Sequence, residues 1–203
     1  MQKEYKVKAP LSEEERDRLR EYSDELAHLL FHRGLGEMEE AKSFISPDFS
    51  LLYDPFLLSD MEKTAELIIS AIKENKRICI FSDYDADGIP GAVVLHDFFK
   101  MALFENFFNY IPDRSEEGFG LSTDAIDKIK EEGAEILITI DCGVCDISQV
   151  SYANEKGIVV VITDHHIPSE QGLPDAFAIV NPKISPNYPD QMLCFVKGGV
   201  DIG

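Results

Sequence analysis

The sequence predicts an α/β protein in which a mostly parallel sheet is covered by helices on both faces. From residue 77 onward, apolar runs rich in β-branched residues alternate with helical patterns, which is typical of a parallel sheet. The runs are continuously apolar, and this indicates strands buried on both faces. Three of them end on an aspartate, at Asp83, Asp141 and Asp164. Because the carboxyl ends of parallel strands share one edge, we expect these aspartates to converge.

A helical segment is expected to precede the sheet, over residues 1–76, and to pack on the core. Its first helix is predicted over residues 11–34. Ser12 and Glu15 have the spacing of a capping box, and Gly34 ends the helical pattern. The charged residues of this helix are expected to form a solvated face.

Two further helices are predicted in this segment. The first covers residues 36–46 and stops near Pro47. The second covers residues 61–75, with Ser59 as its N-cap. One face of the second helix carries the apolar side chains of Met61, Ala65, Ile68 and Ile72.

Residues 77–194 are predicted to form a domain of alternating strands and helices. Strands are expected over residues 77–83, 106–112, 135–143 and 158–166, followed by the apolar run 176–182. Helices are expected over residues 92–104, 122–133 and 147–157, with a glycine-bearing loop before the first of them.

The charge of the chain sets a condition on any nucleic-acid partner. Formal net charge is −19, from 38 acidic and 19 basic side chains, and this argues against non-specific binding to phosphates. A carboxylate-rich site loaded with divalent cations is locally much less negative, so binding at such a site stays possible. No apolar run approaches the ~18 residues of a membrane span, and the first ten residues lack the core of a signal peptide. We therefore expect a cytoplasmic protein with no membrane contact.

The four cysteines, Cys79, Cys142, Cys145 and Cys194, are expected to be reduced thiols. Cys79 lies inside a predicted strand, which does not suit a disulfide framework. The C-x-x-C spacing of Cys142 and Cys145 permits a thiol–disulfide function. We favour buried packing for this pair, because Cys142 directly follows a candidate metal ligand.

The stretch "FSDYDADGIPG" places Asp83, Asp85 and Asp87 on alternate positions. Their mutual repulsion is relieved most simply by a divalent cation. An EF-hand calcium loop is disfavoured, because its twelfth position is Val94 instead of glutamate and the segment before it is a predicted strand. A solvated surface turn is the alternative for the triplet taken alone.

Asp141 and the sequence Asp164–His165–His166 complete a candidate metal site. Aspartates also cap helices after strands, so each one alone has a structural alternative. Oxygen-rich sites with one or two imidazoles suit Mn²⁺ or Mg²⁺. Two such ions ~4 Å apart favour hydrolysis of a phosphoester, and a spare histidine can contact the phosphate or protonate the leaving oxygen.

The motifs "DYDADG", "DCG" and "DHH", in this order and each at a strand end, resemble the DHH phosphoesterase family. The connecting segments "DPFLLSDM", "YIPDRSEEGFGL" and "AIVNPK" are similar to those of its RecJ-type exonucleases. The resemblance covers roughly residues 30 to 194. It implies a catalytic domain over residues 77–194 that uses two Mn²⁺ or Mg²⁺ ions to degrade single-stranded DNA from the 5′ end in recombination and repair. It also makes single-strand-binding protein a candidate partner.

The resemblance implies a role for each matching residue. It makes metal ligands of Asp83, Asp85, Asp87, Asp141 and His165, and places Asp85, Asp141, His165 and His166 in the catalytic group. His166 is expected to face the scissile phosphate, and Asp164 to orient the histidines. Gly88 and Gly91 are expected to let the backbone approach the site closely.

Two residues are expected to contact the nucleotide. Arg114 is the cation that the resemblance brings near it, with an exposed surface arginine as the alternative. Phe119 stands where the family usually has tyrosine, and stacking on a base survives that change.

The C-terminal stretch departs from the family pattern. Residues 195–203 read "FVKGGVDIG", where the family has small residues close to "GAGVAFK" and then continues. We therefore expect an atypical end, without a further metal-binding aspartate and without the second, DHHA1-like domain that closes over DNA.

Three other functions remain open at this point. DHH relatives also cleave short oligonucleotides or cyclic dinucleotides. A haloacid-dehalogenase-type phosphatase would use Asp83 as a nucleophile, and would leave the histidine pair unexplained. A non-catalytic remnant would bind metal or nucleic acid without turnover.

Overall fold

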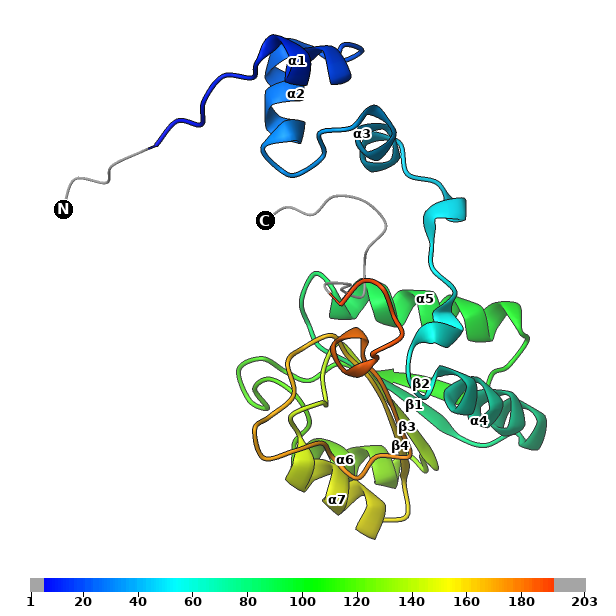
Figure 1. Ribbon diagram of the computed structural model, residues 1–203. Coiled ribbons are helices and arrows are strands. Elements are labelled where there is room, and N and C mark those ends of the chain that lie inside the picture. Colours follow the sequence, from blue (N-terminus) through cyan, green and yellow to red (C-terminus); the bar gives the residue numbers. More distant parts are fainter. Residues whose placement is uncertain (1–5, 192–203) are drawn as a thin grey trace, which may run out of the picture. The chain divides into compact units, whose positions relative to one another are not determined.

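The computed structural model describes residues 6–191. The chain divides into two compact units, Met1–Leu52 and Tyr53–Gly203, which are treated separately below (Figure 1). The predicted C-terminal departure over residues 195–203 lies outside the described residues. Within the described part of the chain, no helix is both long enough and apolar enough to cross a membrane.

The first unit consists of short helices. They are α1 (Glu13–Arg18), α2 (Asp24–Phe31), α3 (Met38–Ile45) and the 3₁₀ helix η1 (Phe49–Leu51). The predicted capping box is present, because the Ser12 hydroxyl accepts a hydrogen bond from the Glu15 amide and the Glu15 carboxylate accepts one from the Ser12 amide. A small core of Leu19, Ala27, Leu30 and Ala41 holds this unit together.

The prediction of a single helix over residues 11–34 is wrong, because the chain breaks between α1 and α2. Ser23 starts the second helix by accepting a hydrogen bond from the Leu26 amide. The Arg16 guanidinium donates to the carbonyl oxygens of Leu19 and Tyr22, so the backbone groups freed at the break find partners. The break allows Leu19, which is fully buried, to pack into the core beside α2.

The second unit is built on a five-stranded sheet in the order β2-β1-β3-β4-β5. Its strands are β1 (Ile78–Ser82), β2 (Phe107–Tyr110), β3 (Ile136–Ile140), β4 (Val159–Thr163) and β5 (Ala178–Val180). All neighbouring pairs are parallel. The α/β class, the parallel sheet and the adjacency of the three aspartate-ending strands are thus confirmed.

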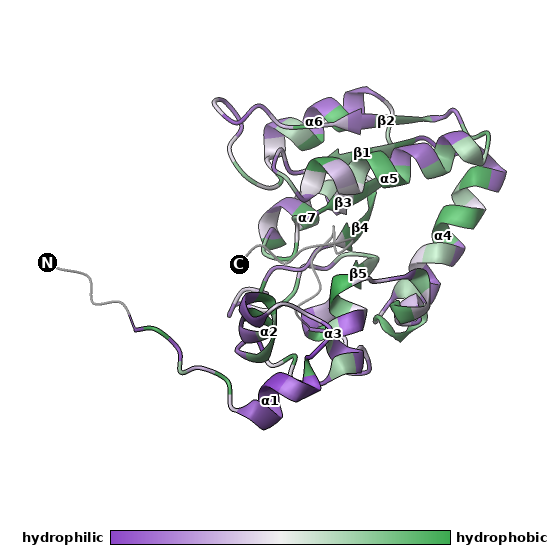
Figure 2. Cartoon of the chain, turned by 90° about the horizontal axis from the view of Figure 1, so that it is seen from above, coloured by the Kyte–Doolittle hydropathy of each residue, from purple (hydrophilic) through white to green (hydrophobic). Residues whose placement is uncertain are grey.

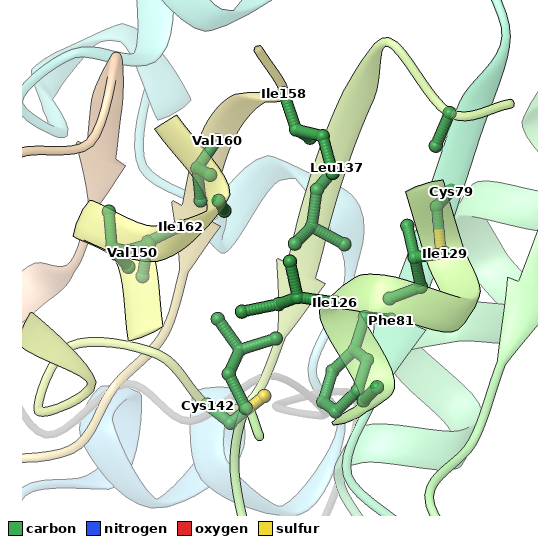
Figure 3. Close-up of a cluster of buried hydrophobic side chains, with 14 of the residues drawn as sticks. Cys79, Phe81, Ile126, Ile129, Leu137, Cys142, Val150, Ile158, Val160 and Ile162 are labelled. Atoms are coloured by element: carbon green, nitrogen blue, oxygen red, sulfur yellow. The ribbon is translucent and has the colours of Figure 1, made fainter. Parts of the chain in front are cut away.

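Helices cover both faces of this sheet (Figure 1). On one face, α6 (Thr123–Glu131) and α7 (Ile147–Glu155) pack against side chains of β1, β3 and β4, and Figure 3 shows part of this cluster. On the other face lie α4 (Met61–Glu74) and α5 (Gly88–Met101), together with buried isoleucines of β1 and β3. The central strands β1 and β3 are predominantly hydrophobic in Figure 2 and buried along their whole length, as burial on both faces requires.

One predicted helix start and one predicted N-cap in the second unit are wrong. Helix α5 begins at Gly88, four positions before the predicted start, so the glycine-bearing loop is shorter than expected. Helix α4 is preceded by Asp60 as N-cap instead of Ser59. The helix itself starts at Met61, as predicted, and the Asp60 carboxylate accepts a hydrogen bond from the Ile179 amide and none from α4.

The 3₁₀ helices η2 (Pro55–Leu57) and η3 (Pro182–Ile184) complete the second unit. The boundary between the units falls after residue 52, and α4 belongs to the sheet-containing unit. The helical segment 1–76 and its packing on the core stay predictions.

Candidate metal centre

The strand pairing places the three strand-terminal aspartates side by side. The Asp83 amide donates to the Ile140 carbonyl at 3.2 Å, the Asp141 amide to Thr163 at 2.9 Å and the Asp164 amide to Val180 at 3.0 Å. Each aspartate is therefore hydrogen-bonded to the end of the next strand. The sheet brings together the carboxylates that the sequence predicted to converge.

Two groups of potential ligand atoms form at this edge. One consists of Asp83, Asp85 and Asp141, and the other of Asp141, His165 and His166. Within each group the ligand atoms lie within 4.8 Å of one another. Asp141 belongs to both groups, so its carboxylate stands where it can bridge two cations.

The first group depends on the start of helix α5. The Asp85 Oδ1 atom accepts hydrogen bonds from the amides of Asp87 at 2.9 Å and Gly88 at 3.0 Å. The Gly88 amide, more than any other group, lowers the pKa of Asp85. A Cβ atom on Gly88 would lie 2.5 Å from the Asp83 carbonyl oxygen, so only glycine fits this close approach.

Asp141 occupies the most constrained position of the site. It is 1 % exposed and its φ is 62°, a left-handed conformation that is uncommon for a residue with a side chain. Burial, reinforced by the charge of Asp85, raises its pKa to about 8. An ionised carboxylate at this position therefore needs a nearby positive charge.

Two buried carboxylate oxygens stand where they could bind a cation. Within residues 6–191, the Oδ1 atoms of Asp83 and Asp141 have no hydrogen-bond partner. His165 Nε2 lies 2.9 Å from Asp141 Oδ1, but no hydrogen bond joins the two atoms. Burial raises the pKa of Asp83 and lowers the pKa of His165, so the imidazole keeps a free lone pair. This set of oxygen and imidazole donors fits Mn²⁺ or Mg²⁺.

The Asp164 carboxylate accepts hydrogen bonds from the backbone of the two histidines. Its Oδ1 atom accepts hydrogen bonds from the amides of His165 at 2.7 Å and His166 at 3.0 Å. The same atom lies 2.7 Å from His166 Nδ1, and its Oδ2 atom accepts from the Val144 amide at 3.0 Å. This geometry agrees with the orienting role expected for Asp164.

Asp87 lies at the rim of the site. Its Oδ2 atom is 4.0 Å from His165 Nε2, and Asp87 belongs to neither of the two compact groups. The structure thus brings the other four expected ligands together more closely than it does Asp87.

The loop over residues 111–121 brings both expected nucleotide contacts toward the site. The Arg114 guanidinium lies over the Tyr84 ring, 5.5 Å from its centroid. The Phe119 ring meets His166 edge to face, with the centroids 5.9 Å apart, and the residue is 59 % exposed. Tyr84 was not anticipated from the sequence, although it lies between two of the predicted ligands.

Asn181 is a second residue that the sequence analysis missed. Its side-chain amide donates to the His166 carbonyl at 2.9 Å, and its Oδ1 atom accepts from the Lys183 amide at 2.8 Å. Asn181 is fully buried and directly follows β5. It could have been found by the same signal as the aspartates, a polar residue that ends an apolar strand.

The cysteines of the C-x-x-C stretch have different surroundings. Cys142 is buried in the cluster of Figure 3, as predicted, and burial raises the pKa of its thiol. The prediction of buried packing is wrong for Cys145, which is exposed and lies 3.4 Å from the Ile167 carbonyl oxygen through its sulfur. It lies on the loop after β3. A raised pKa at Cys142 does not favour thiol–disulfide chemistry.

Comparisons with known proteins agree with this site. The family model described as "DHH family, N-terminal domain" matches residues 77–195. The single-stranded-DNA-specific exonuclease RecJ of Bacillus subtilis is 37 % identical over 185 residues, covering 88 % of this chain and 23 % of the relative. RecJ of Escherichia coli is 35 % identical over 140 residues, covering 68 % and 24 %. The chain spans about a quarter of the length of these relatives.

Solved structures give the same result. RecJ of Thermus thermophilus in complex with Mn²⁺ is similar with a TM-score of 0.64 and 26 % identity, over 87 % of this chain and 24 % of that one. Exonuclease RecJ bound to manganese is similar with a TM-score of 0.60 and 30 % identity, over 66 % and 34 %. The predicted resemblance is confirmed, and the chain belongs to the DHH family.

Proposed function

We propose that this chain carries the catalytic centre of a metal-dependent phosphodiesterase that degrades single-stranded DNA. The observation that carries the proposal is the pair of ligand groups that share Asp141 at the edge of the sheet. The substrate class follows from the relatives, which are named as exonucleases specific for single-stranded DNA.

Two Mn²⁺ or Mg²⁺ ions are proposed to bind at these groups. Their ligands would be Asp83, Asp85, Asp87, Asp141 and His165. When bound, such ions lower the pKa of an attacking water and offset the charge that develops on the phosphate. Asp141 would stand between the two ligand groups even before metal binds, because its backbone amide is hydrogen-bonded to the Thr163 carbonyl.

His166 is proposed to act on the substrate instead of binding metal. When its Nδ1 atom carries the proton that faces Asp164, the Nε2 atom is left to contact the phosphate or to exchange a proton with the leaving oxygen. The His166 side chain is 44 % exposed, so it is accessible to a bound strand. Asn181 and Asp164 hold its backbone from two sides.

Arg114 and Phe119 are proposed to position the strand. The guanidinium would bind a phosphate oxygen, and the exposed ring of Phe119 would stack on a base. Both contacts matter in a chain of net charge −19, because little of the remaining surface attracts DNA.

Other parts of the proposal rest on the family resemblance alone. They are the 5′-to-3′ direction, the role in recombination and repair, and single-strand-binding protein as a partner. A cytoplasmic location is proposed from the free thiols of Cys79 and Cys142, which suit a reducing compartment.

The test is degradation of a 3′-labelled single-stranded oligonucleotide in the presence of Mn²⁺, beside the same sequence as a duplex. We expect stepwise shortening of the single strand from its 5′ end. Asp85→Ala and His165→Ala are each expected to reduce the rate by at least about 100-fold. The matched control is Asp97→Ala, which removes an exposed carboxylate from the body of α5 and is expected to leave the rate unchanged.

Two results would contradict the proposal. Equal loss of activity in Asp97→Ala would point to general charge effects in place of the metal centre. If the folded chain binds Mn²⁺ but does not shorten the strand, a non-catalytic metal-binding function is favoured. If it cleaves only dinucleotides or a cyclic dinucleotide, the other DHH activities are favoured.

A further inference from the structure

We infer that two carboxylates outside the metal centre, Glu117 and Asp146, are positioning residues that hold the loop over residues 111–121 beside the histidines. The inference rests on the proposed function, because this loop carries both proposed substrate contacts, Arg114 and Phe119. Neither carboxylate belongs to the ligand groups, and their hydrogen bonds are made to the loop and its flanking elements.

Glu117 connects the middle of the loop to β2 and α6 by hydrogen bonds. Its Oε1 atom accepts hydrogen bonds from the Tyr110 hydroxyl at the end of β2 and from Lys128 Nζ on α6, the latter at 2.8 Å. Its Oε2 atom accepts from the Asp113 amide at 2.9 Å. The Glu117 side chain is only 10 % exposed, so these bonds are largely shielded from competing water.

Asp146 holds the other end of the loop. Its Oδ2 atom accepts a hydrogen bond from the Leu121 amide at 2.9 Å. The backbone of Gly120 has a φ of +76°, and a Cβ atom there would lie 2.9 Å from the same oxygen. Asp146 is the N-cap residue of α7, but its carboxylate makes no hydrogen bond to that helix. The Asp146 side chain therefore stabilises the loop and does not cap α7.

Phe119 lies between the two anchored points, two residues from Glu117 and two from Leu121. Its own contact with His166 is one edge-to-face approach of an exposed ring, and such a contact alone is too weak to order a loop. The two carboxylates therefore determine where the ring and Arg114 stand. Loss of an anchor should weaken substrate binding and leave the metal ligands in place.

The first experiment measures single-stranded DNA degradation by Glu117→Gln, Asp146→Ala and Asp146→Asn in the full chain. Glu117→Gln and Asp146→Ala are expected to raise the half-saturating DNA concentration about tenfold, with the maximal rate and the Mn²⁺ affinity within about twofold of the starting protein. Asp146→Asn keeps an oxygen that can accept from Leu121, so we expect near-normal behaviour. The control is Glu105→Gln, which removes an exposed glutamate–lysine ion pair of the same 2.8 Å length, formed with Lys100 outside the loop.

The second experiment needs no nuclease activity. Arg114 is exposed within the loop, so trypsin cleavage after it, identified by mass spectrometry, reports how often the loop opens. Glu117→Gln and Asp146→Ala are expected to speed this cut about fivefold. Asp146→Asn and Glu105→Gln are expected to leave it unchanged.

Unchanged cleavage together with unchanged half-saturation in Glu117→Gln would overturn the inference. Parallel losses of maximal rate and Mn²⁺ affinity would also overturn it, because they would place the effect at the metals. If Asp146→Ala does not fold, the results for Glu117→Gln alone test the inference. A starting protein that degrades no DNA would refute the proposed function, and the tryptic cut would still decide the anchoring.

Discussion

The two halves of the candidate metal centre, the strand ends and the start of α5, are built in different ways. Asp141 and Asp164 end buried strands and are each 1 % exposed, whereas Asp85 is exposed at the start of α5. Burial raises the pKa of Asp141, and the amides of the helix start lower the pKa of Asp85. The strand ends thus supply a buried carboxylate, Asp141, that is costly to ionise, while the helix start supplies a carboxylate, Asp85, that is easily kept charged.

The two halves should differ most in how much each contributes to the free energy of unfolding. Asp164→Ala would leave the amides of Val144, His165 and His166 without their acceptor, and should cost about 3 kcal/mol of unfolding free energy. Asp85→Ala removes an acceptor near solvent and should cost about 1 kcal/mol or less. Urea unfolding of the metal-free proteins, followed by far-ultraviolet circular dichroism, measures both. Similar losses in the two variants would mean that burial does not distinguish the halves.

The next effect concerns metal affinity. Asp141→Asn removes the shared ligand charge and should weaken Mn²⁺ binding about 100-fold in isothermal titration calorimetry, or about 2.7 kcal/mol. Asparagine tolerates the left-handed backbone of this position, so the variant should fold. Retention of Mn²⁺ affinity would show that Asp141 is not shared between two ions.

The same substitution tests the pH dependence of stability. The pKa of Asp141 is raised in the fold to about 8, above the ordinary value of 3.8, so folding favours its protonated form. This contribution is full below the unfolded pKa and is lost as the pH rises through the folded pKa. The metal-free protein should therefore lose thermal stability between about pH 4 and 8, and Asp141→Asn should show a flatter profile. A profile that the substitution leaves unaltered would contradict the assignment.

The smallest of these effects tests the close approach of Gly88, at the start of α5, to the backbone of Asp83. Gly88→Ala places a methyl group against the Asp83 carbonyl and should cost about 2 kcal/mol, with weaker Mn²⁺ binding. Gly157→Ala is the matched control, because its φ is +72° but nothing lies within 4 Å of the added carbon. It should cost about 1 kcal/mol and leave Mn²⁺ binding unchanged. Equal metal affinities in the two variants would argue against close approach as the role of Gly88.

Much of the second unit could be predicted because its signals are local. Strands β1, β3 and β4 are short, largely apolar runs, and they end directly before the predicted aspartates Asp83, Asp141 and Asp164. Parallel pairing then brings those residues together without further information. The roles assigned to the individual ligands stay predictions, although four of the five expected ligands fall in the compact groups.

The features that were missed depend on contacts distant in the sequence. Asp60, which is the N-cap of α4 in place of Ser59, accepts a hydrogen bond from Ile179, and the Asn181 side chain donates one to the His166 carbonyl. The break after Leu19 follows from packing within a small core. The place of Asn181 after an apolar strand is itself a local signal, but no local pattern identifies the partners of these residues, because the contacts form only once the chain has folded.

The row of hydrogen bonds from Asp83 to Ile140, Asp141 to Thr163 and Asp164 to Val180 also has a consequence for folding. A slip of one residue between two strands turns every side chain to the opposite face, so a misaligned sheet could not assemble both ligand groups. On the proposed function, Mn²⁺ would bind only correctly aligned chains and would shift the folding equilibrium toward them. Mn²⁺ titration of a refolded sample would then count the molecules whose three strands have found their proper alignment.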